Sequence, residues 1–133
     1  MKSLVGEWDT TASSGQPVHV SYRLISNGTA LMETQTADES EMVTIYNPDG
    51  EQVLLTHYCS HGNEPRMRAK AAPGEVEKLD FRLVDIANLS SPKALHRNRL
   101  VVTFQDSRHF TQEWTSVENG RSGTEVFRFA RAK

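Results

Sequence analysis

The chain has 133 residues, of which 37% are hydrophobic and 24% are charged, and its formal net charge at pH 7 is −2. This composition suits a globular protein and argues against intrinsic disorder. The basic residues form no run longer than two, so the sequence lacks the basic stripe of a nucleic-acid-binding protein.

The start of the chain carries no signal for export. Lys2 is followed by only a few apolar residues before the charged Glu7 and Asp9, and no segment reaches the roughly 18 apolar residues of a membrane span. The single cysteine, Cys59, excludes an intrachain disulfide and favours a reducing compartment. We therefore expect a cytoplasmic protein without a membrane span, although a removed leader would leave the same sequence.

Alternation of apolar and polar residues is the dominant pattern. Val18, Val20 and Tyr22 alternate with polar residues, and the same period of two recurs over residues 78–83 and 99–105. This period places alternate side chains on opposite faces of a strand. Ten strands are predicted, over residues 4–12, 17–26, 29–37, 41–47, 51–59, 65–71, 75–85, 98–106, 109–117 and 122–131.

Turn-forming residues separate these strands at short intervals. They occur at residues 14–17, 27–28, 47–50, 61–63, 73–74, 106–107 and 119–120, and most contain glycine or proline. The segment 86–97 breaks the pattern. There we expect an irregular loop or a short helical turn with Ser91 as N-cap and Pro92 at its first position.

The predicted fold is all-β: a closed up-and-down antiparallel β-barrel of about ten strands, formed by residues 1–133 as one domain. Closure removes the exposed edges that ten short strands would otherwise leave. A two-sheet sandwich is the alternative, but nearly every connection reads as a local hairpin. A barrel of ten strands is wider than its own side chains readily fill, so we expect a cavity.

The motif Gly6-Glu7-Trp8 in the first strand resembles the start of calycin barrels, the group of lipocalins and fatty-acid-binding proteins. The resemblance implies that Trp8 plugs one barrel end and that an arginine near the end of the chain packs over its ring. Arg128 and Arg131 are the two candidates. We favour Arg131, because Arg128 lies on the opposite strand face from its aromatic neighbours.

Three further blocks resemble bacterial lipocalin-like proteins, namely residues 56–59 (Thr-His-Tyr-Cys), 62–67 (Gly-Asn-Glu-Pro-Arg-Met) and 110–114 (Phe-Thr-Gln-Glu-Trp). Nitrobindin-like haem barrels also begin with G-x-W, but they ligate haem through a histidine near the C-terminus. The last histidine here is His109, and residues 125–131 contain none. No cofactor is therefore expected.

The inward faces of the predicted strands supply the candidate ligand contacts. His57 continues an apolar face, and Gln112 lies between two inward aromatic residues, where a buried amide needs a partner. Arg66 follows a tight turn and either meets an anionic ligand or lies on the outer face beside other basic residues. The candidate ligand-binding residues are His57, Gln112, Trp114, Tyr22, Tyr46, Met67, Phe104, Phe127 and Arg66, with Met32 and Thr34 as further possible lining residues.

His57, Cys59 and His61 could instead form part of a metal site, or Cys59 could be a nucleophile activated by His57. His61 falls in a predicted turn, however, and no oxyanion loop, orienting acid or G-x-S-x-G motif accompanies the cysteine. No metal ligand and no catalytic residue is therefore predicted.

Three functional hypotheses remain. The first is a barrel that binds a small hydrophobic or amphipathic molecule in its interior. The second is a solid-cored barrel that acts through protein contacts, for example as a homodimer. The third is an enzyme that uses His57 as general base. The sequence favours the first.

Overall fold

A computed structural model describes residues 1–38, 40–70 and 77–132 of the chain. In these ranges the chain forms ten β-strands and two short 3-10 helices, η1 (Lys2–Leu4) and η2 (Ser26–Gly28). The strands are β1 (Gly6–Thr11), β2 (Pro17–Ile25), β3 (Ala30–Ala37), β4 (Ser40–Asp49), β5 (Gln52–Tyr58), β6 (Glu64–Lys70), β7 (Lys78–Ala87), β8 (His96–Asp106), β9 (His109–Glu118) and β10 (Arg121–Arg131).

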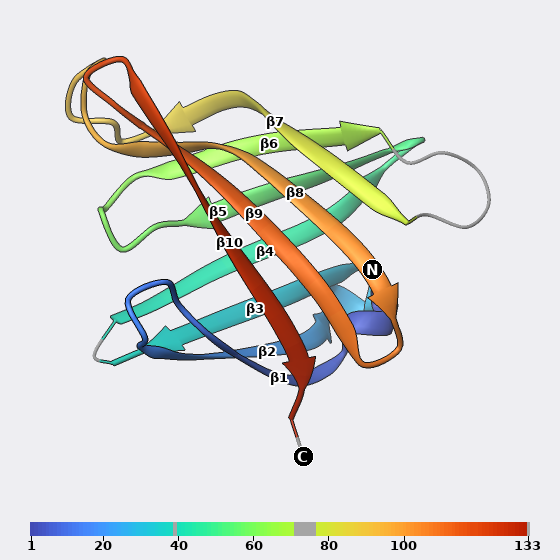
Figure 1. Cartoon of the computed structure of the whole chain (residues 1–133). Helices are drawn as coiled ribbons and strands as arrows, with labels where there is room; N and C mark the ends of the chain where they lie inside the picture. Colours follow the sequence, from blue (N-terminus) through green and yellow to red (C-terminus); the bar gives the residue numbers. More distant parts are fainter. Residues whose placement is uncertain (39, 71–76, 133) are drawn as a thin grey trace.

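Each strand pairs antiparallel with the next in sequence, and β10 returns to pair with β1 (Figure 1). The result is a closed up-and-down barrel, which confirms the predicted fold class. The closing seam is short: β1 and β10 share the register pairs Trp8↔Arg131 and Asp9↔Ala130, whereas β9 and β10 pair along nearly their whole length.

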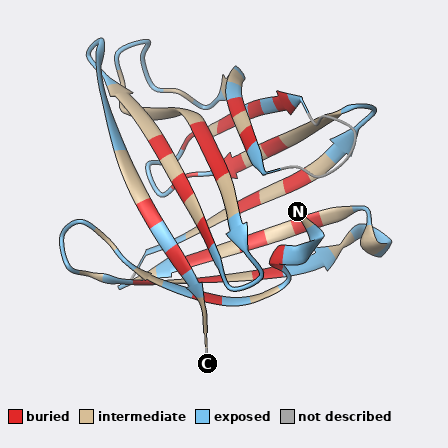
Figure 2. Ribbon diagram, turned by 45° about the vertical axis from the view of Figure 1, so that its right-hand side comes forward, coloured by how far each residue is buried: buried red, intermediate tan, exposed pale blue. Residues whose placement is uncertain are grey.

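Alternation along the strands separates the interior from the outer surface. On β2 the side chains of Val18, Val20 and Tyr22 are buried, and on β10 those of Phe127 and Phe129 are buried. Figure 2 shows the consequence as buried bands that alternate with more exposed residues along most strands. The apolar residues of these bands form one continuous core inside the barrel.

Two strand pairs contain register shifts. The pairing of β6 with β7 shifts between Arg66 and Met67, and the pairing of β8 with β9 shifts between Arg97 and Arg99 and again between Phe104 and Asp106. An extra residue in one strand reverses the alternation of side chains on either side of it. On β8, Leu100 pairs with Trp114. Two residues further along β9, Ser116 pairs with Arg97 and not with Asn98, which is the extra residue.

Several predicted boundaries differ from the structure. The first strand begins at Gly6 and not at residue 4, because Leu4 belongs to η1, and β4 extends to Asp49, so that its turn lies at residues 50–51. The expected loop near 86–97 is residues 88–95, a turn in which the Ala94 N–H donates to the Ser91 carbonyl at 3.0 Å, without a helix. The predicted turn at 73–74 lies outside the described residues.

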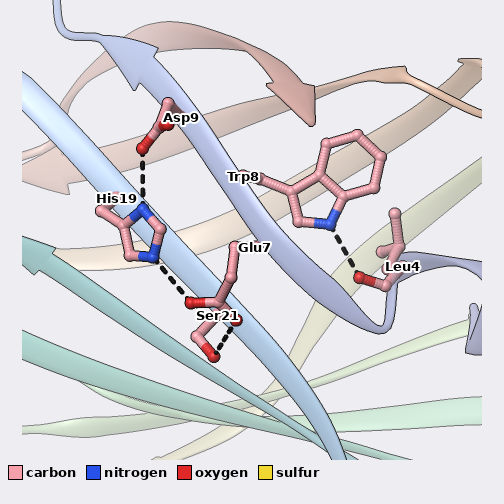
Figure 3. Close-up of polar contacts among 6 residues, drawn as sticks. All are labelled: Leu4, Glu7, Trp8, Asp9, His19 and Ser21. Atoms are coloured by element: carbon pink, nitrogen blue, oxygen red, sulfur yellow. Dashed lines mark hydrogen bonds and ion pairs between the residues drawn. The ribbon is translucent and has the colours of Figure 1, made fainter. Parts of the chain in front are cut away.

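One end of the barrel is closed by Trp8, and we call it the Trp8 end. The indole N–H of Trp8 donates to the Leu4 carbonyl at 2.7 Å, which ties η1 to β1 (Figure 3). The guanidinium of Arg131 lies over the indole, with Cζ 4.2 Å from the ring centroid. Its Nη1 and Nη2 donate to the carbonyls of Val5 and Ser3, each at 3.0 Å. Arg131, and not Arg128, therefore packs on this tryptophan.

At the opposite end a second arginine, Arg97, lies over a second tryptophan, Trp114, with Cζ 4.3 Å from the ring centroid. The connections at residues 12–16, 59–63, 88–95 and 119–120 lie there. We call it the Arg97 end, because the half-buried Arg97 enters the barrel from the start of β8 at this end.

Gly6→Ala should destabilise the protein by about 2 kcal/mol in urea denaturation, because Gly6 has a positive φ of 128° and a Cβ there would lie 2.8 Å from Nη1 of Arg131. The matched control is Gly123→Ala, since a Cβ at Gly123 would meet nothing within 4 Å. We expect the control to change stability by less than about 0.5 kcal/mol. Equal losses in the two variants would contradict this account of the Trp8 end.

Candidate functional site

The middle of the barrel contains a hydrogen-bonded polar cluster centred on Glu33 of β3. One carboxylate oxygen, Oε2, accepts from the hydroxyl of Tyr22 at 2.5 Å, the hydroxyl of Tyr46 at 2.8 Å and the amide nitrogen of Gln112 at 2.9 Å. All four side chains are at most 2% exposed. A buried carboxylate is tolerated where several donors replace its lost hydration, and these three residues provide that replacement.

Trp114 extends this cluster toward the Arg97 end. Its indole N–H donates to the side-chain oxygen of Gln112 at 3.0 Å. Because the indole can only donate, this bond orients the Gln112 amide so that its NH₂ group faces Glu33 and the Tyr22 hydroxyl. The Gln112 amide is thus held in one orientation by Trp114 at its oxygen and by Glu33 and Tyr22 at its nitrogen.

Arg97 lies over the indole ring of Trp114. Its Cζ lies 4.3 Å from the centroid of the indole ring, and its Nη1 lies 3.3 Å from Nε2 of His57. The bulge on β8 is what brings Arg97 inward, since without the extra residue Asn98 would pair with Ser116 and Arg97 would face outward. A guanidinium stacked on an indole is a favourable cation–π contact.

His57 is held as a neutral ring with a defined tautomer. Arg97 can only donate, so Nε2 of His57 accepts, and we infer that the ring proton lies on Nδ1, which contacts the Thr44 hydroxyl at 2.7 Å. The His57 ring also packs on Trp114, with centroids 4.8 Å apart. Burial, followed by the positive charges of Arg97 and His61, lowers the pKa of His57 to about 3.

This geometry does not equip His57 as a general base. Both ring nitrogens already have partners, none of the hydrogen bonds or ion pairs of the described residues joins the ring to a carboxylate, and a pKa of about 3 makes the ring a weak proton acceptor near neutral pH. The physical role that fits is positioning: His57 and Trp114 together hold the guanidinium of Arg97.

Burial also shifts the other titratable groups of the cluster. It raises the pKa of Glu33, while the bonds from Tyr22, Tyr46 and Gln112 act in the opposite direction. Burial likewise lowers the pKa of Arg97, opposed chiefly by Cys59 and Glu33. Guanidinium groups remain charged in proteins, so Arg97 is a positive charge held partly out of water.

The polar cluster meets a pocket of about 540 Å³ at the Arg97 end. Arg97 and Trp114 form its inner wall, and Ser116, Gly123 and Glu125 border it from β9 and β10. It lies along the part of the seam where β10 has no register pairs with β1. There the segment after β1 is joined to β10 by side chains, such as the Ser13 hydroxyl, which donates to Glu125 at 2.9 Å.

A second pocket, of about 490 Å³, lies at the Trp8 end. It is mostly apolar and is bordered by Leu4, Trp8, Leu79 and Phe104. The predicted lining residue Phe104 is therefore half-buried at this end, away from His57 and Gln112.

The remaining predicted residues divide between interior and surface. Met67 and Phe127 are buried in the core, as His57, Gln112, Trp114, Tyr22 and Tyr46 are. Arg66 does not reach the interior: it is exposed on the outer face of β6 and forms a two-pronged ion pair with Asp85. The outer-face alternative for Arg66 is the one that applies.

Sequence reasoning missed Glu33 and the inward placement of Arg97. On β3 the inward residues are Leu31, Glu33 and Gln35, not Met32 and Thr34. Each face of this strand carries one large apolar residue among mostly polar ones, so periodicity could not choose between them. No sequence signal marked the bulge that turns Arg97 inward.

Two other groups of titratable residues do not form a binding site. On the outer face, His19 lies between Asp9 and Glu7, with its two ring nitrogens 2.7 and 2.9 Å from different carboxylates, so the acids do not converge on one point (Figure 3). His61 is exposed, whereas His57 and Cys59 are buried. Among the described residues, no group of three or more His, Cys, Asp or Glu side chains is arranged to hold a metal ion.

His57→Gln should flatten the dependence of stability on pH. The fold favours the neutral ring, so the contribution of His57 is complete above its usual pKa of 6.5 and is lost as pH falls toward about 3. Between pH 7 and about pH 4.5 the unmodified protein should lose about 2–3 kcal/mol from this residue, measured by urea denaturation. The variant should lack this loss.

The exposed His61 provides the control for this experiment. His61→Gln should keep the pH dependence of the unmodified protein. Glu33, whose raised pKa acts in the opposite direction, is common to both variants and does not affect the comparison. Identical pH profiles for His57→Gln and the unmodified protein would contradict the assignment.

Comparison with known proteins supports the fold. Neither a protein-family model nor a curated protein matches the sequence. Among solved structures, the chain is similar to a protein of unknown function of the DUF3598 family from Nostoc punctiforme, with a TM-score of 0.53 and 12% sequence identity. The match covers 98% of this chain and 48% of that chain, so this chain spans about half its length. In the described residues, no helix is long and apolar enough to cross a membrane.

Proposed function

We propose that this chain is a calycin-like domain that binds a small amphipathic molecule at the Arg97 end of its barrel. The observation that carries the proposal is the contact between a buried polar cluster and a pocket: Arg97 and Trp114 belong to both. Pockets that bind small molecules commonly combine an aromatic wall with a few positioned polar groups.

The barrel provides different conditions at its two ends. Trp8, η1 and Arg131 close the Trp8 end, which leaves the Arg97 end as the route to the polar cluster. The ligand would lie with its apolar or aromatic part against Trp114 and its polar part toward Arg97. His57 and Gln112 would act behind these two residues, by holding them in place.

A barrel that acts through protein contacts is the second candidate. One observation favours it: the hydrogen-bonded side chains of Glu33, Tyr22, Tyr46 and Gln112 occupy the middle of the barrel. The two candidate functions differ at the pocket of the Arg97 end. The ligand-binding function requires this pocket, whereas a function through protein contacts does not.

The test uses N-phenyl-1-naphthylamine, an uncharged aromatic dye whose fluorescence rises on binding, followed by displacement with fatty acids, retinoids, bilins and haem. Gly123→Phe should abolish dye binding, because a side chain at position 123 has open space and would fill the pocket. The unfolding temperature of this variant should stay within a few degrees of that of the unmodified protein.

The control is Ala130→Phe, which adds the same ring to the exposed outer face of the same strand. It should bind the dye as the unmodified protein does. Equal dye binding by Gly123→Phe and Ala130→Phe would overturn the proposed site. A stable dimer in solution scattering, together with absent dye binding, would favour the second candidate.

A further inference from the structure

We infer that the ligand carries a single negative charge, such as a carboxylate or a sulfonate, and that Arg97 binds this group. The inference rests on the proposed function and adds the chemical class of the ligand.

Arg97 is a half-buried cation with little compensation from the protein. In the described residues no carboxylate oxygen lies within 4 Å of its guanidinium, and its hydrogen bond is to the neutral His57 at 3.3 Å. A guanidinium has five N–H donors. Holding such a group partly out of water is costly unless an acceptor, preferably an anion, completes it.

Two carboxylates, those of Glu33 and Glu125, act electrostatically on Arg97, and both already accept hydrogen bonds from other residues. Glu33 accepts from three neutral donors, and Glu125 accepts from the Ser13 hydroxyl. Arginines of the outer face have the opposite arrangement: the exposed Arg66 and the half-buried Arg99 each form a two-pronged pair with an aspartate. The cation facing the pocket is thus left for an external partner.

The shape of the guanidinium site limits what that partner can be. The N–H donors of Arg97 lie in the plane of its guanidinium, which rests against the indole of Trp114, so an anion binds in that plane, as carboxylates and sulfonates do. The part of the ligand next to the anion then lies beside the indole, where an apolar or aromatic group packs well.

Glu125 restricts the charge of the ligand. It borders the same pocket from β10, so a second negative charge on the ligand would meet a carboxylate of like sign. The pocket therefore suits one anionic group near Arg97 and a body that is uncharged, or positively charged, toward Glu125.

The experiment compares two dyes that differ mainly in charge. 8-Anilinonaphthalene-1-sulfonate is the anionic counterpart of N-phenyl-1-naphthylamine, and both can be titrated into the same protein. Arg97→Gln should weaken binding of the sulfonate dye about tenfold or more and change binding of the neutral dye by less than about twofold. Arg97→Lys should give an intermediate loss, because it keeps the charge but not the planar donors.

Two further variants make the result specific. Arg68→Gln removes an arginine from the exposed outer face of β6 and should leave both affinities unchanged. Glu125→Gln should tighten binding of the sulfonate dye several-fold and leave the neutral dye unaffected, because it removes the like charge from the pocket. Thermal unfolding of each variant establishes that it is folded, and Arg97→Met replaces Arg97→Gln if the amide variant is not.

The outcomes separate the inference from the proposed function. If Arg97→Gln and Arg68→Gln affect the sulfonate dye equally, the assignment of an anionic ligand to Arg97 is wrong. Blockage of the neutral dye by Gly123→Phe would nevertheless still support a binding pocket. If the neutral dye binds equally well to Gly123→Phe, the pocket itself is wrong, whatever the charge preference.

Discussion

The barrel depends on a short seam between its first and last strands. β1 and β10 share few register pairs, and those pairs include Trp8 and Arg131, whose side chains also stack on each other. Arg131 in addition holds the chain that leads into β1 through the carbonyls of Val5 and Ser3. One arginine therefore joins the two ends of the sheet, covers the tryptophan and keeps the Trp8 end closed. The enclosed interior exists only while this seam is closed.

Closure has a consequence for the polar residues inside. Once the sheet encloses Glu33, its carboxylate has no access to bulk water and depends on Tyr22, Tyr46 and Gln112 for hydrogen bonds. These partners come from β2, β4 and β9, so the carboxylate connects strands on different sides of the barrel. A buried network of this kind favours one arrangement of the interior, because its three donors all bond to one carboxylate oxygen and the loss of any of them removes part of the compensation for the buried charge.

Arg97 differs from Glu33 in the way its charge is compensated. Glu33 is bonded by several donors within the protein, whereas Arg97 rests on Trp114 and a neutral histidine at the border of a pocket. Interior charges completed by the protein are explained by the fold alone, but an interior charge that faces a pocket without an acid partner is better explained by binding. The contrast between these two residues is the physical basis of the proposed site.

The sequence by itself determined the class of fold and much of the interior. Period-two alternation predicted the ten strands and placed Tyr22, His57, Gln112 and Trp114 inward, since each lies on the more apolar face of its strand. It did not determine β3, where the two faces are equally polar, so the burial of Glu33 follows from pairing with the neighbouring strands.

The position of Arg97 was decided by the tertiary structure. A bulge at one residue of β8 reverses the alternation, and nothing in the local pattern marks it, because its location depends on how β8 aligns with β9. Alternation is a local property that a strand carries in its own residues. Register and bulges are properties of two strands together, and here they determine which polar groups meet inside the barrel.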